Sequence, residues 1–305
     1  MTFTLRPVAP AEYAETLSLW RNVFGVHDEY FTRYYHSDPF YRPGDTLGAW
    51  IDGRLVSTVH TCRRPVRWRN RTYTYAAVAN VATLPEHRGR GLSQALLSAV
   101  MAGWQADGFS FGQLGTGIPA FYERQGWEVM PMGKFRITLE RLIPLTPFHP
   151  ISEDMDILAR YLRSTRPLLL ERTPDYMAGW VSYERSKLGT ETWAIGGHGY
   201  ITVHLPQDSS EVQVQEWIAP NAETEQALIL TALCAAQRHG ISQVSFHGMP
   251  QFFDPVAVFG ALGTVTLTPE EHAMIRNVCL TDEEYDAVKG AYIAGQATCW
   301  PADWY

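Results

Sequence analysis

Short apolar runs separated by turn residues make up most of the chain, and two kinds of hydrophobic periodicity alternate along it. Runs that alternate every second residue, or that are apolar throughout, predict strands, whereas apolar residues three or four positions apart predict helices. In the first half, strands are expected at residues 3–7, 47–51, 55–60, 65–68, 72–75 leading into 75–83, 109–114 and 135–139, and helices at 9–20, 26–36, 92–104 and 118–126. Residues 135–139 are expected to close the sheet that the earlier strands form.

The second half repeats the β-β-α-β order that surrounds residues 75–104. A proline-rich stretch at 144–150 comes first and is typical of a linker, because proline removes donors and fixes φ. Strands then follow at 192–195, 200–205, 212–219 and 244–247, with a strongly apolar helix at 223–239 before the last of them. We therefore expect two copies of one fold, over residues 1–145 and 150–280, and a C-terminal helix and aromatic tail at 281–305.

The stretch over residues 75–97 combines a buried strand, a glycine-rich turn and a helix start, which together predict an anion site. The first N–H groups of a helix have no partner within it, and the helix dipole adds positive charge there. Gly89 and Gly91 would let backbone N–H groups approach a phosphate, and Arg88 and Arg90 add fixed charge. A Walker loop and a dinucleotide fingerprint are both excluded, because neither spacing is present.

The turn Arg88-Gly89-Arg90-Gly91-Leu92-Ser93 resembles the acyl-CoA-binding motif of the GNAT family of N-acetyltransferases, Arg/Gln-x-x-Gly-x-Gly/Ala. Ser93 departs from the last position, but it is small enough for the helix to approach closely. The resemblance implies a mixed α/β (α+β) fold with a largely antiparallel central sheet flanked by helices. It further implies that Arg88, Gly89, Arg90, Gly91, Leu92 and Ser93 hold the CoA pyrophosphate and that the backbone of Val81, Ala82 and Thr83 pairs with the pantetheine arm. The alternative is a surface Arg-Gly turn after an ordinary strand.

A second segment resembles the same family. The family's helix Phe-Tyr-x-x-x-Gly-aromatic matches residues 121–127, with Pro119 in the first turn and Gly126 at the C-terminal stop. In many members that tyrosine lies beside the CoA sulfur, so the resemblance implies that Tyr122 is the general acid for the leaving thiolate. The alternative is that Tyr122 packs with Phe121 in the core.

The second copy is expected to lack a CoA site. Its turn over residues 220–225 has no glycine, and Glu223 and Glu225 stand where a phosphate would bind, so like charge opposes a pyrophosphate. One active and one degenerate half resemble the bacterial Eis-type acetyltransferases, which carry a third, sterol-carrier-like domain. With Tyr305 as its last residue, this chain is expected to lack that domain.

The acceptor side is described less well by the sequence. In the family, the segment after the first strand borders the acceptor pocket, and its ionisable residues here are His27, Asp28, Glu29 and His36. The same residues also fit the solvated face of an amphipathic helix. The general base stays unassigned, with His60, a water chain and the C-terminal carboxylate of Tyr305 as further candidates. The aromatic tail is expected to dock against the protein.

Composition excludes several classes of function. A net charge of −7 provides no basic field for nucleic acid, and it fits an anionic co-substrate with a cationic acceptor. The four cysteines lack C-x-x-C spacing, so neither a metal site nor a disulfide framework is expected. No signal peptide or apolar run of about 18 residues is present, which predicts a cytoplasmic protein without a membrane partner.

These observations lead to one hypothesis and one alternative. The hypothesis is an N-acetyltransferase that moves the acetyl group of acetyl-CoA to a primary amine of a small molecule or peptide by direct attack. The alternative is a CoA-binding or protein-interaction module without turnover, in which the second half is the interaction surface. The sequence leaves the acceptor and the oligomeric state open, a homo-oligomer included.

Overall fold

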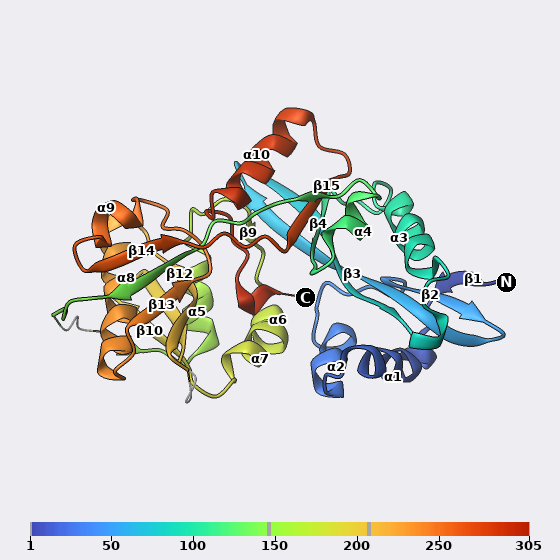
Figure 1. Ribbon diagram of the computed structural model, residues 1–305, viewed down its shortest axis with the longest axis horizontal. Coiled ribbons are helices and arrows are strands. Elements are labelled where there is room, and N and C mark those ends of the chain that lie inside the picture. Colours follow the sequence, from blue (N-terminus) through green and yellow to red (C-terminus); the bar gives the residue numbers. More distant parts are fainter. Residues whose placement is uncertain (1, 145–147, 206–208, 305) are drawn as a thin grey trace.

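Two mixed sheets, each flanked by helices, lie next to one another in the protein (Figure 1). The computed structural model describes residues 2–144, 148–205 and 209–304. Almost all neighbouring strands are antiparallel, and each sheet contains one parallel pair. The fold class expected from the sequence, with two tandem copies of one mixed α/β architecture, is therefore confirmed.

The first sheet is built mainly from the first half of the chain. Its strands run in the order β1 (Thr4–Pro7), β2 (Thr46–Ile51), β3 (Arg54–Trp68), β4 (Arg71–Thr83), β5 (Phe111–Gly115), β15 (Ala273–Asn277) and β6 (Glu128–Val129), and the short β9 (Leu169–Leu170) pairs with β3. The long β3 and β4 form the centre, because their apolar residues are buried almost throughout.

Helices cover both faces of this sheet. On one face lie α1 (Tyr13–Phe24) and α2 (Asp28–His36), and on the other lie α3 (Leu92–Gly103) and the short α4 (Pro119–Glu123) (Figure 1). Two 3-10 turns, Pro10–Glu12 and Pro85–His87, precede α1 and the glycine-rich turn. The helix starts agree with the sequence, since α3 begins directly after Gly91 and α4 begins with Pro119.

The second sheet repeats this plan. Its strands run in the order β14 (Gly263–Leu267), β7 (Phe135–Leu139), β13 (Gln243–Phe246), β12 (Glu211–Ile218), β11 (Gly199–His204), β10 (Thr190–Ile195) and β8 (His149–Pro150). Between β12 and its parallel neighbour β13 runs α8 (Ala222–Arg238), just as α3 runs between β4 and β5. The remaining helices are α5 (Asp154–Tyr161), α6 (Pro174–Tyr176), a π-helical turn at Met177–Val181, α7 (Ser182–Arg185), α9 (Pro255–Phe259), α10 (Asp282–Ile293) and a 3-10 turn at Pro301–Asp303.

Each half donates one strand to the other half's sheet. β7 lies between β13 and β14 of the second sheet, and β15 lies between β5 and β6 of the first. The expectation that residues 135–139 close the first sheet is therefore wrong, although they do form a strand. Period-2 alternation specifies a strand but not its partner, and Phe135 finds its neighbour by stacking on Phe246 at 4.2 Å between ring centroids. The domain ranges 1–145 and 150–280 stay a prediction, but sheet membership crosses them in both directions.

A buried histidine lies at the centre of the aromatic core under the first sheet. His60 on β3 is 1% exposed, and the rings of Trp20, Tyr34 and Tyr35 pack edge-on to it. Its Nδ1 shares a hydrogen bond of 2.8 Å with the Thr46 hydroxyl. Burial, helped by the charge of Arg64, lowers the pKa of His60 to about 3, so the ring is neutral. A neutral, enclosed imidazole makes His60 a structural residue of the core.

Acid should therefore destabilise the fold through His60. In the unfolded chain histidine takes a proton near pH 6.5, whereas the folded His60 stays neutral down to about pH 3. Between these values the unfolded state binds more protons, so stability falls as the pH falls, by about 1.4 kcal/mol per pH unit. We expect His60→Asn to lack this pH dependence. The free energy of unfolding of the variant, measured with urea from pH 7 to pH 5, should therefore fall less steeply than that of the wild type. Equal slopes in the variant and the wild type would contradict the assignment.

Candidate active site

The first sheet opens where β4 and β5 diverge. Among the described residues these parallel strands pair only from Tyr75 with Phe111 to Ala77 with Gln113. A β-bulge at Asn80 turns β4 away, because its φ of 49° is left-handed and the pairing with β3 shifts register next to it. The two strands become the walls of a wedge.

This wedge holds a cavity of about 740 Å³, which we call the wedge cavity. Residues 78–81 of β4 form one wall and residues 113–117, which are the end of β5 and the two residues after it, form the other; Tyr122 of α4 lines the cavity as well. Much of the remaining lining comes from the C-terminal third of the chain: Glu270, His272, Ala273, Cys299 and Trp304. The exchange of β15 into the first sheet is what brings residues 270–273 to the cavity.

One edge of β4 is open to the wedge. Ala82 and Thr83 pair with Thr58 and Ser57 of β3 on one side, while β5 has already diverged on the other. Backbone groups along a strand edge that no neighbouring strand covers can pair with an extended ligand, as in β-strand addition. This geometry fits an amide-containing chain lying along Val81 to Thr83, the residues expected from the sequence.

The glycine-rich turn lies at the end of that edge. Gly89 and Gly91 have φ values of 73° and 74°, which glycine adopts without strain, and a Cβ added at either would meet open space. Gly91 directly precedes α3, whose first N–H groups have no partner within the helix. A glycine turn with free space at a helix N-terminus is suited to a phosphate.

Side chains of the turn hold its shape. The Arg88 Nε donates to the Thr83 carbonyl at 3.2 Å, and the Arg90 Nη2 donates to the Glu86 carbonyl at 2.9 Å. Ser93, which departs from the family motif, shares a hydrogen bond of 2.7 Å between its hydroxyl and that of Thr83. Serine at this position therefore ties α3 to the end of β4.

Tyr122 lies between the core and the wedge cavity. Its ring packs edge-on against Phe121 at 4.9 Å and Trp127 at 6.3 Å between centroids, and the residue is 7% exposed. It also lines the wedge cavity. Burial raises the pKa of Tyr122 to about 12, so the hydroxyl keeps its proton at neutral pH and can act as a donor.

The residues expected on the acceptor side lie elsewhere. His27, Glu29 and His36 are exposed on and next to α2, and they are not among the residues that line the cavities described here. The side chain of Asp28 lies outside the described part of the protein. The same helix turns Tyr30 and Arg33 towards the second half of the chain, so α2 does contribute to a cavity, but through other residues.

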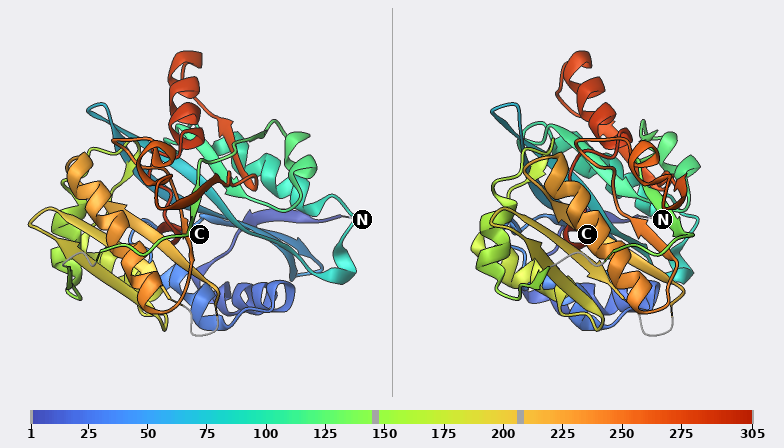
Figure 2. Two further views of the ribbon diagram at one scale, coloured as in Figure 1. Left: turned by 60° about the vertical axis from the view of Figure 1, so that its left-hand side comes forward. Right: turned by 90° about the vertical axis from the view of Figure 1, so that its left-hand side faces the viewer.

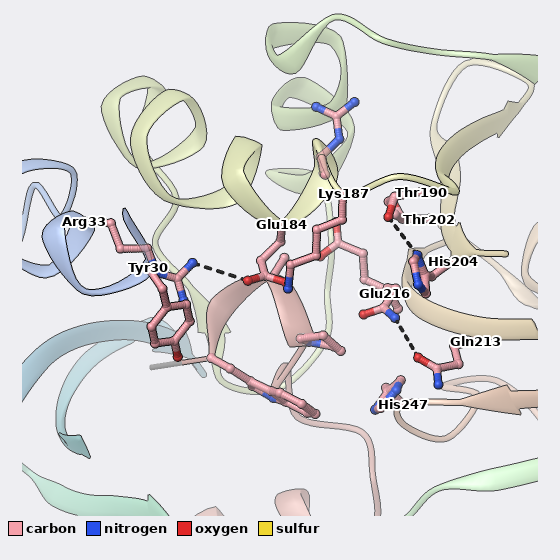
Figure 3. A pocket seen from close by; sticks show the side chains of 15 residues that line it. Tyr30, Arg33, Glu184, Lys187, Thr190, Thr202, His204, Gln213, Glu216 and His247 are labelled. Atoms are coloured by element: carbon pink, nitrogen blue, oxygen red, sulfur yellow. Dashed lines mark hydrogen bonds and ion pairs between the residues drawn. The ribbon is translucent and has the colours of Figure 1, made fainter. Parts of the chain in front are cut away.

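That cavity, which we call the polar cavity, has a volume of about 340 Å³ and lies between α2, α7, the second sheet and the tail (Figure 3). Arg33 lies over the rings of Tyr30 and Trp180 and donates to the Glu184 carboxylate at 3.3 Å. The second sheet contributes hydrogen-bonding side chains that point into the cavity: Thr190, Thr202, His204, Gln213, Glu216 and His247. Trp304 lines both cavities, so they adjoin at this residue.

The C-terminal tail docks between the two sheets (Figure 2), as expected from its aromatic residues. Trp300 is fully buried and packs on Trp217 at 5.1 Å between ring centroids. Arg172 donates to Asp303 at 2.7 Å and to Glu216 at 2.6 Å, and all three residues are buried. The tail thus holds Trp304 in place, while Tyr305 lies outside the described residues.

The corresponding wedge of the second half is filled by the protein itself. Glu225, in the first turn of α8, accepts hydrogen bonds from the Arg166 Nη2 at 3.0 Å and from the Trp217 Nε1 at 2.8 Å. It also accepts the backbone N–H groups of Gln251 and Phe252 beyond β13. Glu225 is thus an internal ligand that spans the gap between β12 and β13. The sequence predicted that Glu225 would repel a phosphate, but Arg166 neutralises its charge. Glu225 instead opposes ligand binding by occupying the space between β12 and β13.

Several residues of the wedge cavity could not be foreseen. Glu270, His272 and Trp304 follow the predicted strands of the second half, and no local pattern connects them with residues 78–122. Burial acts to raise the pKa of Glu270, but the Lys134 ammonium at 3.0 Å and a backbone N–H outweigh it and hold the pKa below its usual value. The cavity therefore contains one ionised carboxylate.

The described part of the chain contains no group of His, Cys, Asp or Glu side chains arranged to hold a metal ion. None of its described helices has the length and hydrophobicity needed to cross a membrane.

The sequence and the structure were compared with those of known proteins. Residues 4–130 match the model of the acetyltransferase (GNAT) domain. No curated protein matches the sequence. Among solved structures, the chain is similar to a probable N-acyltransferase from Enterococcus faecalis V583 (16% identity, 91% of this chain and 73% of that one, TM-score 0.73). It is also similar to Eis1 from Mycobacterium abscessus (18%, 94% and 76%, 0.69) and to a GCN5-related N-acetyltransferase from Kribbella flavida (18%, 90% and 71%, 0.67).

These structural likenesses are at low identity and establish the fold across both halves. The matched residues 4–130 contain β4, the glycine-rich turn, α3, β5 and Tyr122, which are the main elements of the wedge. Residues 4–130 thus match a GNAT acetyltransferase domain, and the chain shares the tandem fold of Eis1.

Proposed function

We propose that the protein transfers the acetyl group of acetyl-CoA to a primary amine of a small molecule or peptide. The observation that carries this proposal is the wedge between β4 and β5, whose open strand edge leads from the wedge cavity to the glycine-rich turn at the start of α3. A long ligand with a phosphate at one end, amides in the middle and a reactive group at the other end matches these three features in order.

In this arrangement the CoA pyrophosphate binds at the backbone of residues 88–93. The open space beside Gly89 and Gly91 and the unpaired N–H groups of α3 support this assignment. The pantetheine amides pair with the free edge of Val81 to Thr83, and the thioester enters the wedge cavity. A backbone N–H of β4 near the bulge at Asn80 donates to the carbonyl oxygen.

Tyr122 is the general acid of the transfer. An amine that arrives as an ammonium first gives one proton to solvent, and its neutral nitrogen then forms the C–N bond. As the C–S bond breaks, the Tyr122 hydroxyl gives its proton to the sulfur, and the product nitrogen loses one proton that returns to the phenolate through water. A pKa near 12 keeps the Tyr122 proton available until the thiolate forms.

The acceptor approaches from the side of Trp304, where the wedge cavity and the polar cavity adjoin. Glu270 is the ionised carboxylate of the wedge cavity and attracts a cationic amine. The uncharged hydrogen-bonding groups of the polar cavity suit the remainder of an acceptor that is polar.

The test is release of free CoA from acetyl-CoA in the presence of a panel of primary amines, with calorimetry of acetyl-CoA alone. We expect turnover with at least one amine and one CoA site per chain, because Glu225 fills the second wedge. Gly91→Glu should weaken acetyl-CoA binding at least ~10-fold, since it places a carboxylate at the proposed phosphate site and strains a left-handed φ.

Gly240→Glu is the matched control, because Gly240 also has a positive φ and open space but lies in the second half. Binding lost equally in both variants would trace the loss to backbone strain. Two equal CoA sites, or a site that survives Gly91→Glu, would contradict the assignment. CoA binding without turnover for any amine would favour a CoA-binding module over an enzyme.

A further inference from the structure

Gln113 stands at the point where the wedge begins. It forms the last residue pair between β5 and β4, opposite Ala77, and it lines the wedge cavity. The residue is 2% exposed. Both its amide nitrogen and its amide oxygen are buried without a hydrogen-bond partner among the described residues.

An unpartnered buried amide costs stability, because both of its polar atoms lose their hydrogen bonds to water. At this position the fold could instead hold an apolar side chain, as most of the neighbouring wall residues do. On the opposite wall the Asn80 Nδ2 is likewise buried without a partner, and Asn80 lines the same cavity. Among the described residues, polar atoms without partners thus lie in both walls, on two residues that line the wedge cavity.

The Gln113 carboxamide presents one donor and one acceptor side by side, and its complement is a group with an N–H and an oxygen on the same carbon. The tetrahedral intermediate of acetyl transfer is such a group, because the attacking nitrogen and the carbonyl oxygen share one carbon. We propose that Gln113 bridges them: its Oε1 accepts an N–H of the amine, and its Nε2 donates to the developing oxyanion. This inference rests on the proposed function.

The proton balance of the reaction stays as described above. The C–N bond forms and the C–S bond breaks, Tyr122 supplies the proton of the thiol, and the nitrogen gives up one proton through water. Gln113 takes up and releases none, since a carboxamide does not titrate in this range. Its role is to orient the nitrogen and to share the oxyanion with the backbone of β4.

Gln113→Met keeps the volume of the side chain and removes both polar atoms. Because a β4 backbone donor remains, we expect kcat to fall only about tenfold, the effect of roughly one hydrogen bond. The affinity for acetyl-CoA should change little, and unfolding in urea should occur at the same or a higher concentration. Lower activity together with unchanged or higher stability separates a role in the reaction from a structural one.

A second measurement needs no turnover. In the complex with acetyl-CoA labelled with ¹³C at the carbonyl, a donor at Nε2 lowers the carbonyl stretching frequency, and infrared difference spectra should show this lowering reduced in Gln113→Met. Gln125→Met is the control, because the Gln125 amide is also unpartnered but is not among the residues lining the cavity.

The outcomes are distinct. A wild-type protein that binds acetyl-CoA and acetylates no amine ends the proposed function, while the carbonyl frequency still tests Gln113. A carbonyl frequency equal in wild type and Gln113→Met would overturn the bridging role, as would a wild-type kcat in that variant. A change confined to acetyl-CoA affinity would also overturn it, because it would assign the carboxamide to ground-state binding of the donor.

Discussion

Tyr122→Phe is expected to lower kcat by about 10²–10⁴-fold, the usual contribution of general acid catalysis, while acetyl-CoA affinity changes little. Tyr122 lines the wedge cavity, and burial raises the pKa of its hydroxyl to about 12. Its proton is needed only when the thiolate leaves, so the loss belongs to the transition state and appears in kcat. The loss should shrink for an acyl donor with a more acidic thiol, because that thiolate needs the proton less.

Steady-state kinetics with one good amine provides the measurement, and Tyr292→Phe is the matched control. Tyr292 is also a buried tyrosine, and its hydroxyl has no partner among the described residues, but it is not among the residues that line the wedge cavity. The control should retain the wild-type kcat. If Tyr122→Phe stays within about threefold of wild type, well below the range for a general acid, Tyr122 is a core residue and the proton comes from elsewhere.

Arg172→Met is expected to destabilise the protein by about 3–5 kcal/mol, because it leaves Glu216 and Asp303 buried and facing one another without a counter-charge. Tyr200 donates to Glu216 at 2.8 Å and cannot replace the lost charge. Because Asp303 lies in the tail, the same change should release Trp304 from the junction of the two cavities and reduce activity in the molecules that remain folded.

The pH dependence of this loss has a definite sign. Burial, outweighing the attraction of Arg172, raises the pKa of Asp303 above its ordinary value. An acid with a raised folded pKa favours folding below its unfolded pKa and loses that contribution as the pH rises through the folded one. Without Arg172 the pKa rises further, so the destabilisation should be larger at pH 7 than at pH 4.

Urea unfolding at the two pH values measures this effect. Arg54→Met is the control, because Arg54 and Glu86 form an exposed pair at 3.3 Å that should contribute only about 0–1 kcal/mol. If Arg172→Met and Arg54→Met lose the same free energy of unfolding, the buried cluster contributes no more to stability than an exposed ion pair.

The sequence predicted the local features of the first half well. The glycine-rich turn, the start of α3 and the Pro119 helix each depend on residues close together in the chain, so their residue types determine their structure. The β-bulge at Asn80 had only a weak local signal, since asparagine adopts a left-handed φ more readily than most residues but also occurs in regular strands. The separation of β4 and β5 depends on that bulge, so the wedge could be described only from the structure.

Long-range features were predicted poorly for a physical reason. Strand alternation in residues 135–139 and 273–277 fits either sheet, and the choice depends on packing partners such as Phe246 that lie far away in sequence. The lining by Glu270 and Trp304 follows from the same exchange. In α2, helical geometry turns Tyr30 and Arg33 towards the polar cavity, while His27 and His36, the residues singled out by the sequence, remain exposed.

The exchange of β7 and β15 also sets the order in which the protein can be completed on the ribosome. When residues 1–145 have emerged, β5 has β4 on one side and an unpaired edge on the other, because β15 has not yet been synthesised. At that stage β7 also has no strand to pair with, because β13 and β14 are synthesised later. An unpaired strand edge is where nascent chains associate with one another. The sheet of the first half is thus completed only after all the strands of the second sheet have been synthesised, so the second half acts as an assembly partner of the first.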